Sequence, residues 1–540
     1  MSVTVATTVR DATFDLFRRR GLTTLFANPG STEIPFLVGM PEDLRFVLGL
    51  HEGLVIGLAT GYAIGTDRPA LALLHTTAGL GNAVAAIATA RVNHAPLVIA
   101  VGQQDRRHLA YEPFLAGKLD GLAGNYPVRV EQPAVGQDVP GAIERAFHAA
   151  ETSRGPALVI IPMDDWQAEA DERAPAAVTG ELVRATGVER ADVEPLVRFL
   201  DEAASPALVV GAGADHPETW ASLVELAEKL SAPVFQEPFG GRFGFPGDHP
   251  HFMGVLPPQR AQLRARLAPY DAVLVVGAPA FRQTGYAPGG FTEDETRVAV
   301  LGDDADEVQR SAAQLAVLAP LPAATRALAA LVAGRDAPPP EPMTWPPPPA
   351  PPGPGEPLTA GHVFAALAAR LPEDAIVIEE APVDRPELNA RLRPRRPLGN
   401  LSAAQGGLGF ALPGATGLRM ALPDRPVVAV TGDGAAIYCV QALWSAAHYG
   451  IGAVYVVLAN GGYRIMDRLA EQHGGGSWPW PSFEGLRLSE LARAFGCEGR
   501  RIATVDELDA TLAEVAPTLG TRTAPLLLDV EVSSAPSFDH

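Results

Sequence analysis

Two polar side chains in the C-terminal third of the chain have the type and spacing to bind a cation. Asp433 follows the apolar segment VVAVT (427–431), separated from it by Gly432, and Asn460 follows AVYVVLA (453–459). Both segments have the length and β-branched content of strands buried on both faces of a parallel sheet. Apolar residues between them have the spacing of a crossover helix, namely Val440, Leu443, Trp444 and Ala447.

A right-handed crossover brings the carboxyl ends of both strands to the same edge of one sheet, so Asp433 and Asn460 should lie close together. A carboxylate and an amide oxygen, with a loop carbonyl and phosphate oxygens, suit Mg²⁺ or Ca²⁺. The helix start after Gly434 offers backbone N–H groups to a phosphate. We therefore predict a metal–diphosphate site. The alternative is an ordinary strand–helix–strand unit, because Gly-Asp-Gly turns are common.

The composition of the 540 residues indicates a globular protein. Hydrophobic residues make up 47% and charged residues 19%. A net charge of −20 argues against nucleic-acid binding. Two cysteines, Cys439 and Cys497, can build neither a disulfide framework nor a four-cysteine zinc site. The N-terminus lacks the apolar region of a signal peptide and no apolar run is long enough to span a membrane, so we expect a soluble cytoplasmic protein.

Strands alternate with helices along the chain, which predicts an α/β fold of three doubly wound domains with mostly parallel sheets. The first domain, residues 1–180, begins with an amphipathic helix. Its strand and strand–helix segments are expected at 23–36, 46–65, 71–92, 96–102 and 156–164, with His75 and a glycine-rich turn between the strand and the helix of the third segment.

The second domain, residues 182–335, has expected strands within 205–215, 232–238, 270–281 and 296–304. Its Gly211-Ala212-Gly213 turn is similar to a dinucleotide-binding fingerprint, but His216 stands where a third glycine belongs, which favours a structural turn. Prolines at 336–357 predict a semi-rigid linker that crosses the surface. The third domain, residues 358–540, contains the metal–diphosphate segment and ends with a strand within 524–532.

Longer motifs, spread over nearly the whole chain, resemble one family. The N-terminal ones are FANPGSTEIPFL, GLHEGLVIGLATGYA, LLHTTAGLGNA, PLVIAVGQQ and VIIPMDDW. The later ones are VLVVGAPAFR, AAQGGLGFALPGATG and the GDG…N segment with Asp433 and Asn460. The chain thus resembles the thiamin-diphosphate-dependent decarboxylases and carboligases. NPGSTEIPF and the His75 segment are similar to their benzoylformate decarboxylase branch.

This resemblance implies thiamin diphosphate with Mg²⁺ (or Ca²⁺) as cofactors. It implies a pyrimidine-binding domain at 1–180, a central domain at 182–335 and a diphosphate- and metal-binding domain at 358–540. In such proteins the cofactor lies between domains of two subunits, so the resemblance implies at least a homodimer and usually a homotetramer. The expected partner is a small 2-keto acid or aldehyde, with no nucleic acid and no membrane.

The resemblance also assigns the cofactor site residue by residue. Asp433 and Asn460 would ligate the metal together with the main-chain carbonyl of Gly462. Leu408 would support the bent shape of the cofactor, and the carbonyl of Gly406 would accept a hydrogen bond from its aminopyrimidine. The remaining implied cofactor-binding residues are Asn28, Gly432, Gly434, Ala435 and Tyr463.

Three residues of the first domain are carried over as catalytic groups. Glu52, a carboxyl group held in an apolar cleft beside the pyrimidine ring, would promote the proton loss that forms the reactive ylid. Ser31 would hydrogen-bond the substrate carboxylate, and the imidazole of His75 would transfer protons to reaction intermediates. The structural alternatives are a helix-start glutamate for Glu52, a helix N-cap for Ser31 and a packed strand-end histidine for His75.

Departures from the family pattern leave the substrate open. Thr284 replaces a second active-site histidine and cannot act as an acid or base near neutral pH, and His473 is a candidate replacement. Residues 381–383 (Ala-Pro-Val) stand where the family has Ser or Thr contacts to the diphosphate. Ile465 is larger than the residue expected in the pocket, and Arg464 adds a charge that could pair with an acidic substrate.

The expected function is non-oxidative decarboxylation of a benzoylformate-like 2-keto acid to an aldehyde and CO₂, through ylid attack and an enamine intermediate. A carboligase or lyase acting on aldehydes, or an acetohydroxyacid-synthase-like ligation, is the alternative among enzymes. A catalytically decayed cofactor-binding homologue is the alternative from another class. The joint presence of Glu52, His75, Asp433 and Asn460 argues against decay.

Overall fold

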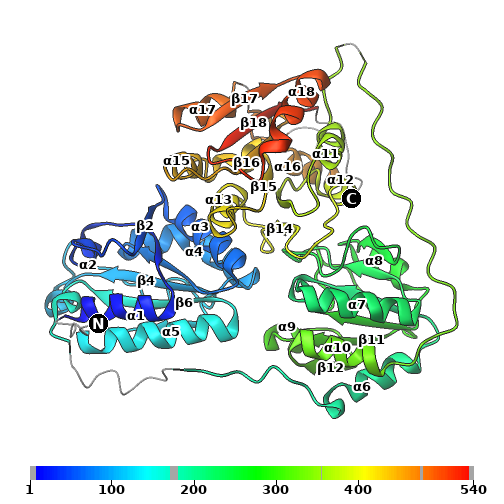
Figure 1. Cartoon of the computed structure of the whole chain (residues 1–540), viewed down its shortest axis with the longest axis horizontal. Coiled ribbons are helices and arrows are strands. Elements are labelled where there is room, and N and C mark those ends of the chain that lie inside the picture. The colour runs from blue at the N-terminus through cyan, green and yellow to red at the C-terminus, as the bar shows by residue number, and fades with distance from the viewer. Residues whose placement is uncertain (1–7, 171–180, 354, 475–477, 484, 534–540) are drawn as a thin grey trace. The chain divides into compact units, whose positions relative to one another are not determined.

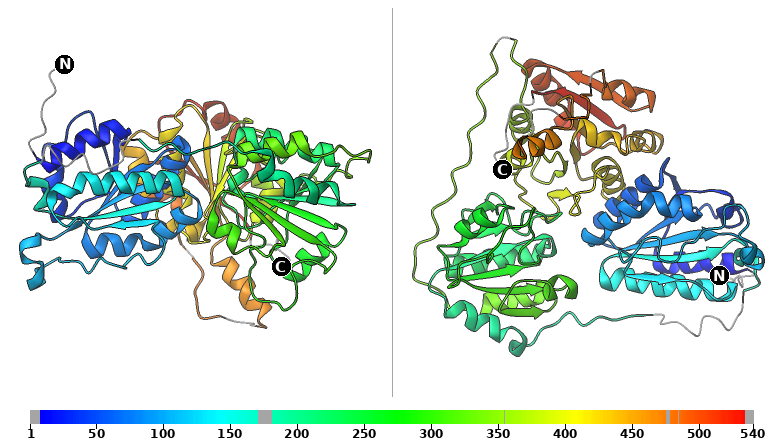
Figure 2. Two further views of the ribbon diagram at one scale, coloured as in Figure 1. Left: turned by 90° about the horizontal axis from the view of Figure 1, so that it is seen from below. Right: turned by 180° about the vertical axis from the view of Figure 1, so that it is seen from behind.

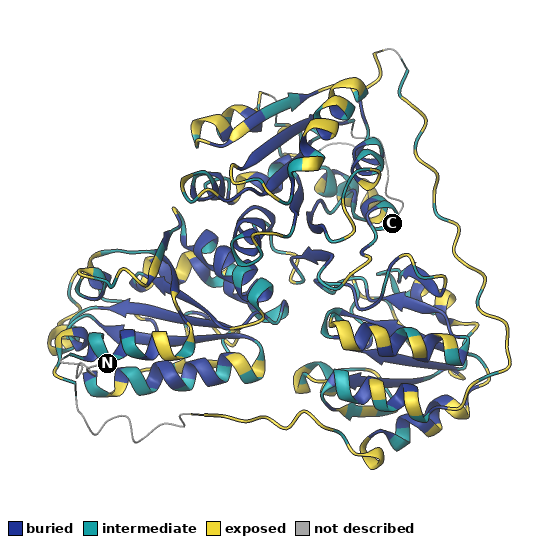
Figure 3. Cartoon of the chain, in the orientation of Figure 1, coloured by how far each residue is buried: buried dark blue, intermediate teal, exposed yellow. Residues whose placement is uncertain are grey.

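The fold is an α/β arrangement of three six-stranded parallel sheets with helices packed on them, as the sequence predicts (Figure 1). The computed structural model describes residues 8–170, 181–353, 355–474, 478–483 and 485–533. Strands are buried almost throughout, whereas the outer faces of the helices are exposed (Figure 3). None of the described helices has the length and apolarity needed to cross a membrane.

The N-terminal sheet and its helices come first along the chain. Its strands are β1 (Thr24–Asn28), β2 (Arg45–Leu48), β3 (Ala70–Leu74), β4 (Leu97–Gln103), β5 (Arg129–Glu131) and β6 (Pro156–Pro162). Its helices are α1 (Val9–Arg20), α2 (Ile34–Leu37), α3 (Glu52–Thr66), α4 (Thr76–Val92) and α5 (Val139–Ser153), and the short 3₁₀ helix η1 (Ser31–Glu33) precedes α2. The strand order is β2-β1-β3-β4-β6-β5.

This sheet is covered on both faces. One face carries an apolar cluster that contains Phe14 and Phe17 of α1 and Phe147 of α5. The cluster also contains side chains from alternate residues of the strands. Helices α3 and α4 cover the opposite face (Figure 2). The structure therefore has the doubly wound layering that alternating strands and helices predict.

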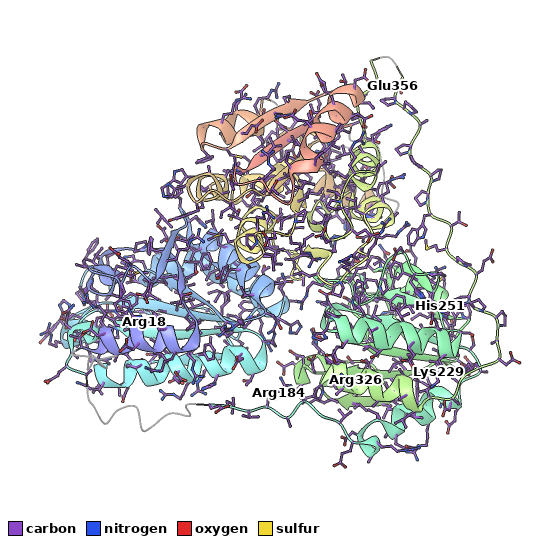
Figure 4. The ribbon with its side chains drawn as sticks, in the orientation of Figure 1. Arg18, Arg184, Lys229, His251, Arg326 and Glu356 are labelled. Atoms are coloured by element: carbon purple, nitrogen blue, oxygen red, sulfur yellow. The ribbon has the colours of Figure 1, made fainter. Side chains whose placement is uncertain are left out.

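The central sheet has the strand order β12-β11-β10-β7-β8-β9. Its strands are β7 (Pro206–Val210), β8 (Val234–Gln236), β9 (Phe252–Val255), β10 (Ala272–Val276), β11 (Arg297–Gly302) and β12 (Leu315–Leu318). Its helices are α6 (Arg190–Asp201), α7 (Pro217–Leu230), α8 (Arg260–Leu267), α9 (Ala305–Gln309) and α10 (Leu321–Leu331). Lys229 of α7 donates a hydrogen bond of 2.8 Å to the Ala329 carbonyl, and Arg326 pairs with Glu218, which ties α7 to α10 (Figure 4).

The Gly-Ala-Gly turn of the central sheet serves packing. A Cβ atom on Gly211 would lie 2.4 Å from Cβ of Ala278, and one on Gly213 would lie 3.0 Å from Cα of Gly277. His216 caps α7, because its Nδ1 accepts a hydrogen bond of 3.3 Å from the Glu218 amide. The glycines thus allow two loops to approach closely, which agrees with the structural interpretation of this turn.

The proline-rich linker has neither helix nor strand among its described residues, as its composition predicts. Trp345 nevertheless anchors it. The Trp345 ring stacks on Phe252 with 6.1 Å between ring centroids, and the Arg393 guanidinium lies 4.1 Å from the Trp345 ring. The linker is therefore fastened at its middle and does more than cross the surface.

The C-terminal sheet has the strand order β14-β13-β15-β16-β18-β17. Its strands are β13 (Ile376–Glu380), β14 (Asn400–Ser402), β15 (Val427–Gly432), β16 (Val454–Ala459), β17 (Glu498–Ile502) and β18 (Leu526–Glu531). The helices of this part are α11 (Ala360–Ala368), α12 (Arg385–Arg391), α13 (Ala411–Ala421), α14 (Asp433–Ile437), α15 (Ala442–His448), α16 (Arg464–Gln472), α17 (Leu488–Ala494) and α18 (Val505–Val515).

Three local predictions need correction. The crossover between β15 and β16 is not one helix but two short ones, α14 and α15, and the buried residues of α15 are Ala442, Leu443, Ser445 and Ala446. The glycine-rich turn expected after His75 is instead the first part of α4, which begins at Thr76. Six strands were not predicted, namely β5, β9, β12, β13, β14 and β17. All but β13 lie at sheet edges, whereas β13 is fully buried between β14 and β15.

The chain divides into two compact units. The first comprises Met1–Arg184, Gln405–Ile502 and Pro517–Val530, and the second comprises Ala185–Ala404, Ala503–Ala516 and Glu531–His540. The first compact unit thus contains the N-terminal sheet together with β15 to β18. The domain boundaries expected from the sequence stay predictions, and the one at 180 lies outside the described residues.

Within the first compact unit, α3 and α13 pack so closely that their backbone atoms are in van der Waals contact. A Cβ atom on Gly61 would lie 2.1 Å from the carbonyl oxygen of Gly414, and one on Gly417 would lie 1.9 Å from that of Leu58. Only glycine allows this approach, because the clashing atoms belong to the backbone and cannot move aside.

We expect Gly61→Ala to destabilise the protein by about 1–3 kcal/mol, since the added methyl group forces the two helices apart. Gly81→Ala in α4 is the matched control, because a Cβ there meets nothing within 4 Å and alanine favours the helix. Urea unfolding followed by circular dichroism measures both variants. Equal midpoints for the two would contradict the close packing of α3 on α13.

Candidate active site

The N-terminal half of the candidate site lies at the carboxyl ends of three adjacent strands. Asn28 ends β1, Glu52 follows β2 and His75 follows β3. Strand β1 lies between β2 and β3, and the chain leaves it first to one side and then to the other. This is the topological switch point of the sheet, where ligands of open α/β folds bind. The strand order therefore explains why residues 28, 52 and 75 gather at one edge.

Glu52 is held between two amide side chains. Asn28 Nδ2 donates to Glu52 Oε1 and Asn82 Nδ2 donates to Glu52 Oε2, both at 3.0 Å. The Glu52 side chain is buried, with 8% exposure. Asn28 was expected from the sequence, whereas Asn82, which lies two turns into α4, was not. Its signal in the sequence is its place inside the LLHTTAGLGNA motif, seven residues after His75.

The helix-start alternative for Glu52 is partly right, since Glu52 is the first residue of α3. The capping group, however, is His51, whose Nδ1 accepts a hydrogen bond of 3.1 Å from the Gly53 amide. The carboxylate of Glu52 takes its donors from β1 and α4 and not from its own helix. It is thus directed toward the strand ends.

His75 and Ser31 occupy the same edge in different ways. His75 Nδ1 lies 2.9 Å from Glu33 Oε2 and 3.0 Å from Thr32 Oγ1, and its side chain is 14% exposed. Ser31 is exposed and begins η1, for which Gly30 is the capping residue. The N-cap alternative for Ser31 is therefore not what the structure has, and its hydroxyl is accessible from solvent.

The C-terminal half of the site lies where β15 and β16 end side by side, with Gly432 paired to Leu458. Asp433 is 4% exposed and accepts hydrogen bonds of 2.8 Å from the amides of Gly434 and Gly461. The Asn460 amide oxygen accepts a bond of 3.3 Å from the Gly462 amide. The loop after β16 is thus fastened to the start of α14, as the crossover argument predicts.

Burial raises the pKa of the Asp433 carboxyl, although the two backbone donors act in the opposite direction. Among the described residues, no group of three or more His, Cys, Asp or Glu side chains is placed to hold a metal ion. The expected ligand set contains one carboxylate, one amide and one carbonyl oxygen, so this finding does not conflict with it. Such hard oxygen donors fit Mg²⁺.

The surroundings of Asp433 leave room for a phosphate group. A Cβ atom on Gly432 or Gly461 would meet nothing within 4 Å, whereas one on Gly434 would lie 2.8 Å from the Phe483 ring. Ala435 is buried in the first turn of α14. Open backbone on one side and tight packing on the other suit an anion that approaches the strand ends. Helix α14 has only five residues, so its dipole adds little to this.

Tyr463 closes one side of the C-terminal half. Its ring packs edge-on against Phe483, with 4.8 Å between ring centroids. A hydrogen bond with the hydroxyl of Tyr438 raises the pKa of Tyr463. Neither Phe483 nor Tyr438 was found from the sequence.

Leu408 and Gly406 lie in the loop before α13, where Gly406 has a φ of +76°, a conformation that glycine allows.

Arg464 is already engaged within its own loop. Its guanidinium donates to the Asn460 carbonyl at 3.2 Å and pairs with Asp467 at 3.1 Å, and Trp480 Nε1 donates to Asp467 at 2.8 Å. The expectation that Arg464 pairs with an acidic substrate is therefore not supported. The side chain instead fixes the carbonyl of a predicted metal ligand. Ile465 is half-buried in the same helix.

The other departures from the family pattern lie as follows. The amide of Ala381 donates to Glu379 Oε1 at 2.7 Å, so this backbone group is already used. Thr284 is exposed in the loop between β10 and β11, in the second compact unit. His473 is exposed at the end of α16.

Comparison with known proteins identifies the family. Three family models match in order: the N-terminal binding domain of thiamine pyrophosphate enzymes at residues 7–123, their central domain at 193–328 and their C-terminal binding domain at 387–530. Benzoylformate decarboxylase of Pseudomonas aeruginosa is 38% identical over 514 residues, which cover 94% of this chain and 96% of that protein. The chain belongs to the thiamine pyrophosphate enzymes.

Two further relatives of this thiamine pyrophosphate enzyme are informative. A solved structure described as a thiamine diphosphate-dependent 4-hydroxybenzoylformate decarboxylase of Rhodococcus jostii RHA1 has a TM-score of 0.92 and 36% identity, and the match covers 97% of this chain and 99% of that one. An acetolactate synthase large subunit of Parasynechococcus marenigrum is 27% identical, over 96% of this chain and 87% of that protein.

Asp433→Asn should abolish metal-dependent retention of thiamine pyrophosphate, because the amide replaces the only carboxylate among the expected ligands. Asp529→Asn is the matched control. Asp529 is also buried, in β18, but it accepts from the Ser489 amide and pairs with Arg501. Gel filtration with Mg²⁺, followed by assay of the retained cofactor, measures both. Loss in the control and retention in Asp433→Asn would contradict the assignment.

Proposed function

We propose that this enzyme decarboxylates an aryl 2-keto acid, non-oxidatively, to the corresponding aldehyde and CO₂. The observation that carries the proposal is the buried Glu52 carboxylate between Asn28 and Asn82, at the strand ends of a thiamine pyrophosphate enzyme. Similarity to decarboxylases of benzoylformate and 4-hydroxybenzoylformate supports the aryl group. The reaction consumes one proton, which ends on the aldehyde carbon.

In this proposal the C-terminal half holds the cofactor's charged end. Asp433, Asn460 and the carbonyl of Gly462 would ligate Mg²⁺, and Gly432, Gly434, Ala435 and Tyr463 would line the diphosphate. Leu408 and the carbonyl of Gly406 position the two rings. When bound, the cofactor supplies the electron sink that decarboxylation of a 2-keto acid requires.

The N-terminal half handles protons and substrate. The Glu52 carboxyl would hold and exchange a proton beside the pyrimidine ring of the bound cofactor, and Asn28 and Asn82 keep its two oxygens in place. The hydroxyl of Ser31 hydrogen-bonds the substrate carboxylate. His75 keeps one ring nitrogen on Glu33, so its other nitrogen, Nε2, is available to hold or deliver a proton at the substrate oxygen.

We further propose that the two halves meet across a homodimer interface. Within the described residues, no hydrogen bond or ion pair joins Asn28, Glu52 or Asn82 to Asp433 or Asn460. The N-terminal half has the proton-handling carboxylate but lacks the metal ligands, and the C-terminal half has the metal ligands but lacks the carboxylate. A second copy of the chain, related by a two-fold axis, would supply both missing halves at once.

A carboligase is the second candidate function, and the match to an acetolactate synthase large subunit over 96% of the chain favours it. The two candidate reactions use the same cofactor and the same Glu52. They differ in the reactant that bonds to the former keto carbon after CO₂ has left. A proton gives the aldehyde, and a second carbonyl compound gives a hydroxyketone.

The test is an assay of CO₂ and aldehyde with thiamine pyrophosphate and Mg²⁺, over 2-keto acids that vary in the group beside the keto carbon. We expect equal amounts of CO₂ and aldehyde from aryl acids and slower turnover of short alkyl acids. Hydroxyketone in place of aldehyde would favour the carboligase. Cofactor binding with no reaction of any acid or aldehyde would contradict both enzymatic proposals.

Glu52→Gln should lower kcat by at least about 100-fold, because the amide cannot exchange the proton, while cofactor retention stays within about twofold of the wild type. Asn82→Ala should lower kcat less, by about tenfold, since Glu52 keeps its bond from Asn28. Steady-state kinetics on the best aryl acid measures both variants. Full turnover by Glu52→Gln would exclude the role assigned to Glu52.

A further inference from the structure

Glu33 is a buried carboxylate that lies within the NPGSTEIPF motif but has no role assigned above. It lies in η1, beside the candidate substrate residue Ser31, and is 1% exposed. Three groups surround its carboxylate. The Gly30 amide donates to Oε2 at 2.7 Å, the Thr32 hydroxyl donates to Oε1, and His75 Nδ1 lies 2.9 Å from Oε2.

The donors and acceptors of this cluster determine which atoms of His75 and Thr32 carry the shared protons. An ionised carboxylate only accepts, so His75 Nδ1 must carry the proton that it shares with Glu33. The single hydroxyl proton of Thr32 goes to Glu33, which leaves Thr32 Oγ1 as a second acceptor, 3.0 Å from the same nitrogen. A neutral His75 is therefore the tautomer with its proton on Nδ1 and a lone pair on Nε2.

The backbone around the pair is shaped to hold it. A Cβ atom on Gly30 would lie 2.5 Å from the His75 ring, and one on Gly102 would lie 1.6 Å from Glu33 Oε1. Glycine at both positions, one in the turn after β1 and one in β4, leaves just enough space for the ring and the carboxylate. Neither group can move far without a clash, so the hydrogen bond between them has a fixed geometry.

We propose that Glu33 is a positioning residue, whose carboxylate holds the proton of His75 on Nδ1 and so reserves Nε2 for proton transfer at the substrate. Among the described residues, Nε2 of His75 has no hydrogen-bond partner. A glutamate that orients a histidine in this way acts on the reaction without touching the substrate. The catalytic meaning of this inference rests on the proposed function, but the tautomer itself does not.

The direct test is nuclear magnetic resonance of the cofactor-free full-length chain, labelled with ring-¹⁵N histidine. The resonance of His75 is assigned by its loss in His75→Asn. We expect the Nδ1–H tautomer in the wild type. Glu33→Gln should increase the Nε2–H tautomer, because the amide group can donate to Nδ1. An Nε2–H tautomer in the wild type, or an unchanged tautomer in Glu33→Gln, would overturn the proposal.

Kinetics then connects the tautomer to turnover. Glu33→Gln should lower kcat at least about tenfold with KM changed by less than about twofold. In the Nε2–H tautomer, Nε2 of the neutral ring already carries a proton and cannot accept another one. The matched control is Glu144→Gln in α5, where another buried glutamate lies 3.4 Å from a histidine, His148, outside the strand-end edge. Its kcat should stay unchanged. An equal loss of kcat in both variants would indicate only structural damage and overturn the proposal.

Thr32→Val is the second variant, in case Glu33→Gln folds poorly. It removes the hydroxyl but keeps the carboxylate, so the Nδ1–H tautomer should persist and kcat should fall less than in Glu33→Gln. A Thr32→Val protein with the Nε2–H tautomer would show that Glu33 alone does not determine the proton position. If no keto acid is turned over, the proposed function fails, while the tautomer measurement still decides the role of Glu33.

Discussion

Much of the N-terminal site depends on the buried carboxylate of Glu52 and the two amides that hold it. Burying an ionisable carboxyl group is costly unless hydrogen-bond donors replace the lost water. Those donors come from Asn28 at the end of β1 and Asn82 in α4. They can meet Glu52 only because β1 lies between β2 and β3, so that three separate segments end at one edge of the sheet. Strand order and the chemistry proposed for Glu52 are thus linked by one hydrogen-bonded group.

The packing of α3 against α13 fixes the position of this edge of the sheet. Helix α3, which begins with Glu52, approaches α13 so closely that Gly61 and Gly417 have no room for a side chain. Helix α13 follows the loop that contains Gly406 and Leu408, so the helix that starts at Glu52 and this loop are fixed within the same compact unit. On the C-terminal sheet the same principle recurs, because Asp433 and the loop after β16 meet where two parallel strands end.

The sequence predicts most of the buried strands, although not β13, and the strand-end residues, because both follow from local patterns. Apolar runs mark β15 and β16, and parallel pairing then brings Asp433 beside the loop of Asn460. The strands that were missed are all short, with three to five residues, and all but β13 lie at sheet edges. Partners that come from distant segments, such as Asn82 and Glu33, leave no periodic signal. The engagement of Arg464 with Asp467 could likewise be seen only in the structure.

The central claim is that Glu52 and Asp433 serve one catalytic site built from two copies of the chain. Its most direct test is the activity of a co-expressed, equimolar mixture of Glu52→Gln and Asp433→Asn, each inactive alone. If the site is shared between subunits, half of the dimers are mixed and each contains one intact site. The mixture should then recover about one quarter of the wild-type rate of CO₂ release. A mixture that contains mixed dimers but stays inactive would contradict the claim, because every site would then lie within a single, damaged chain.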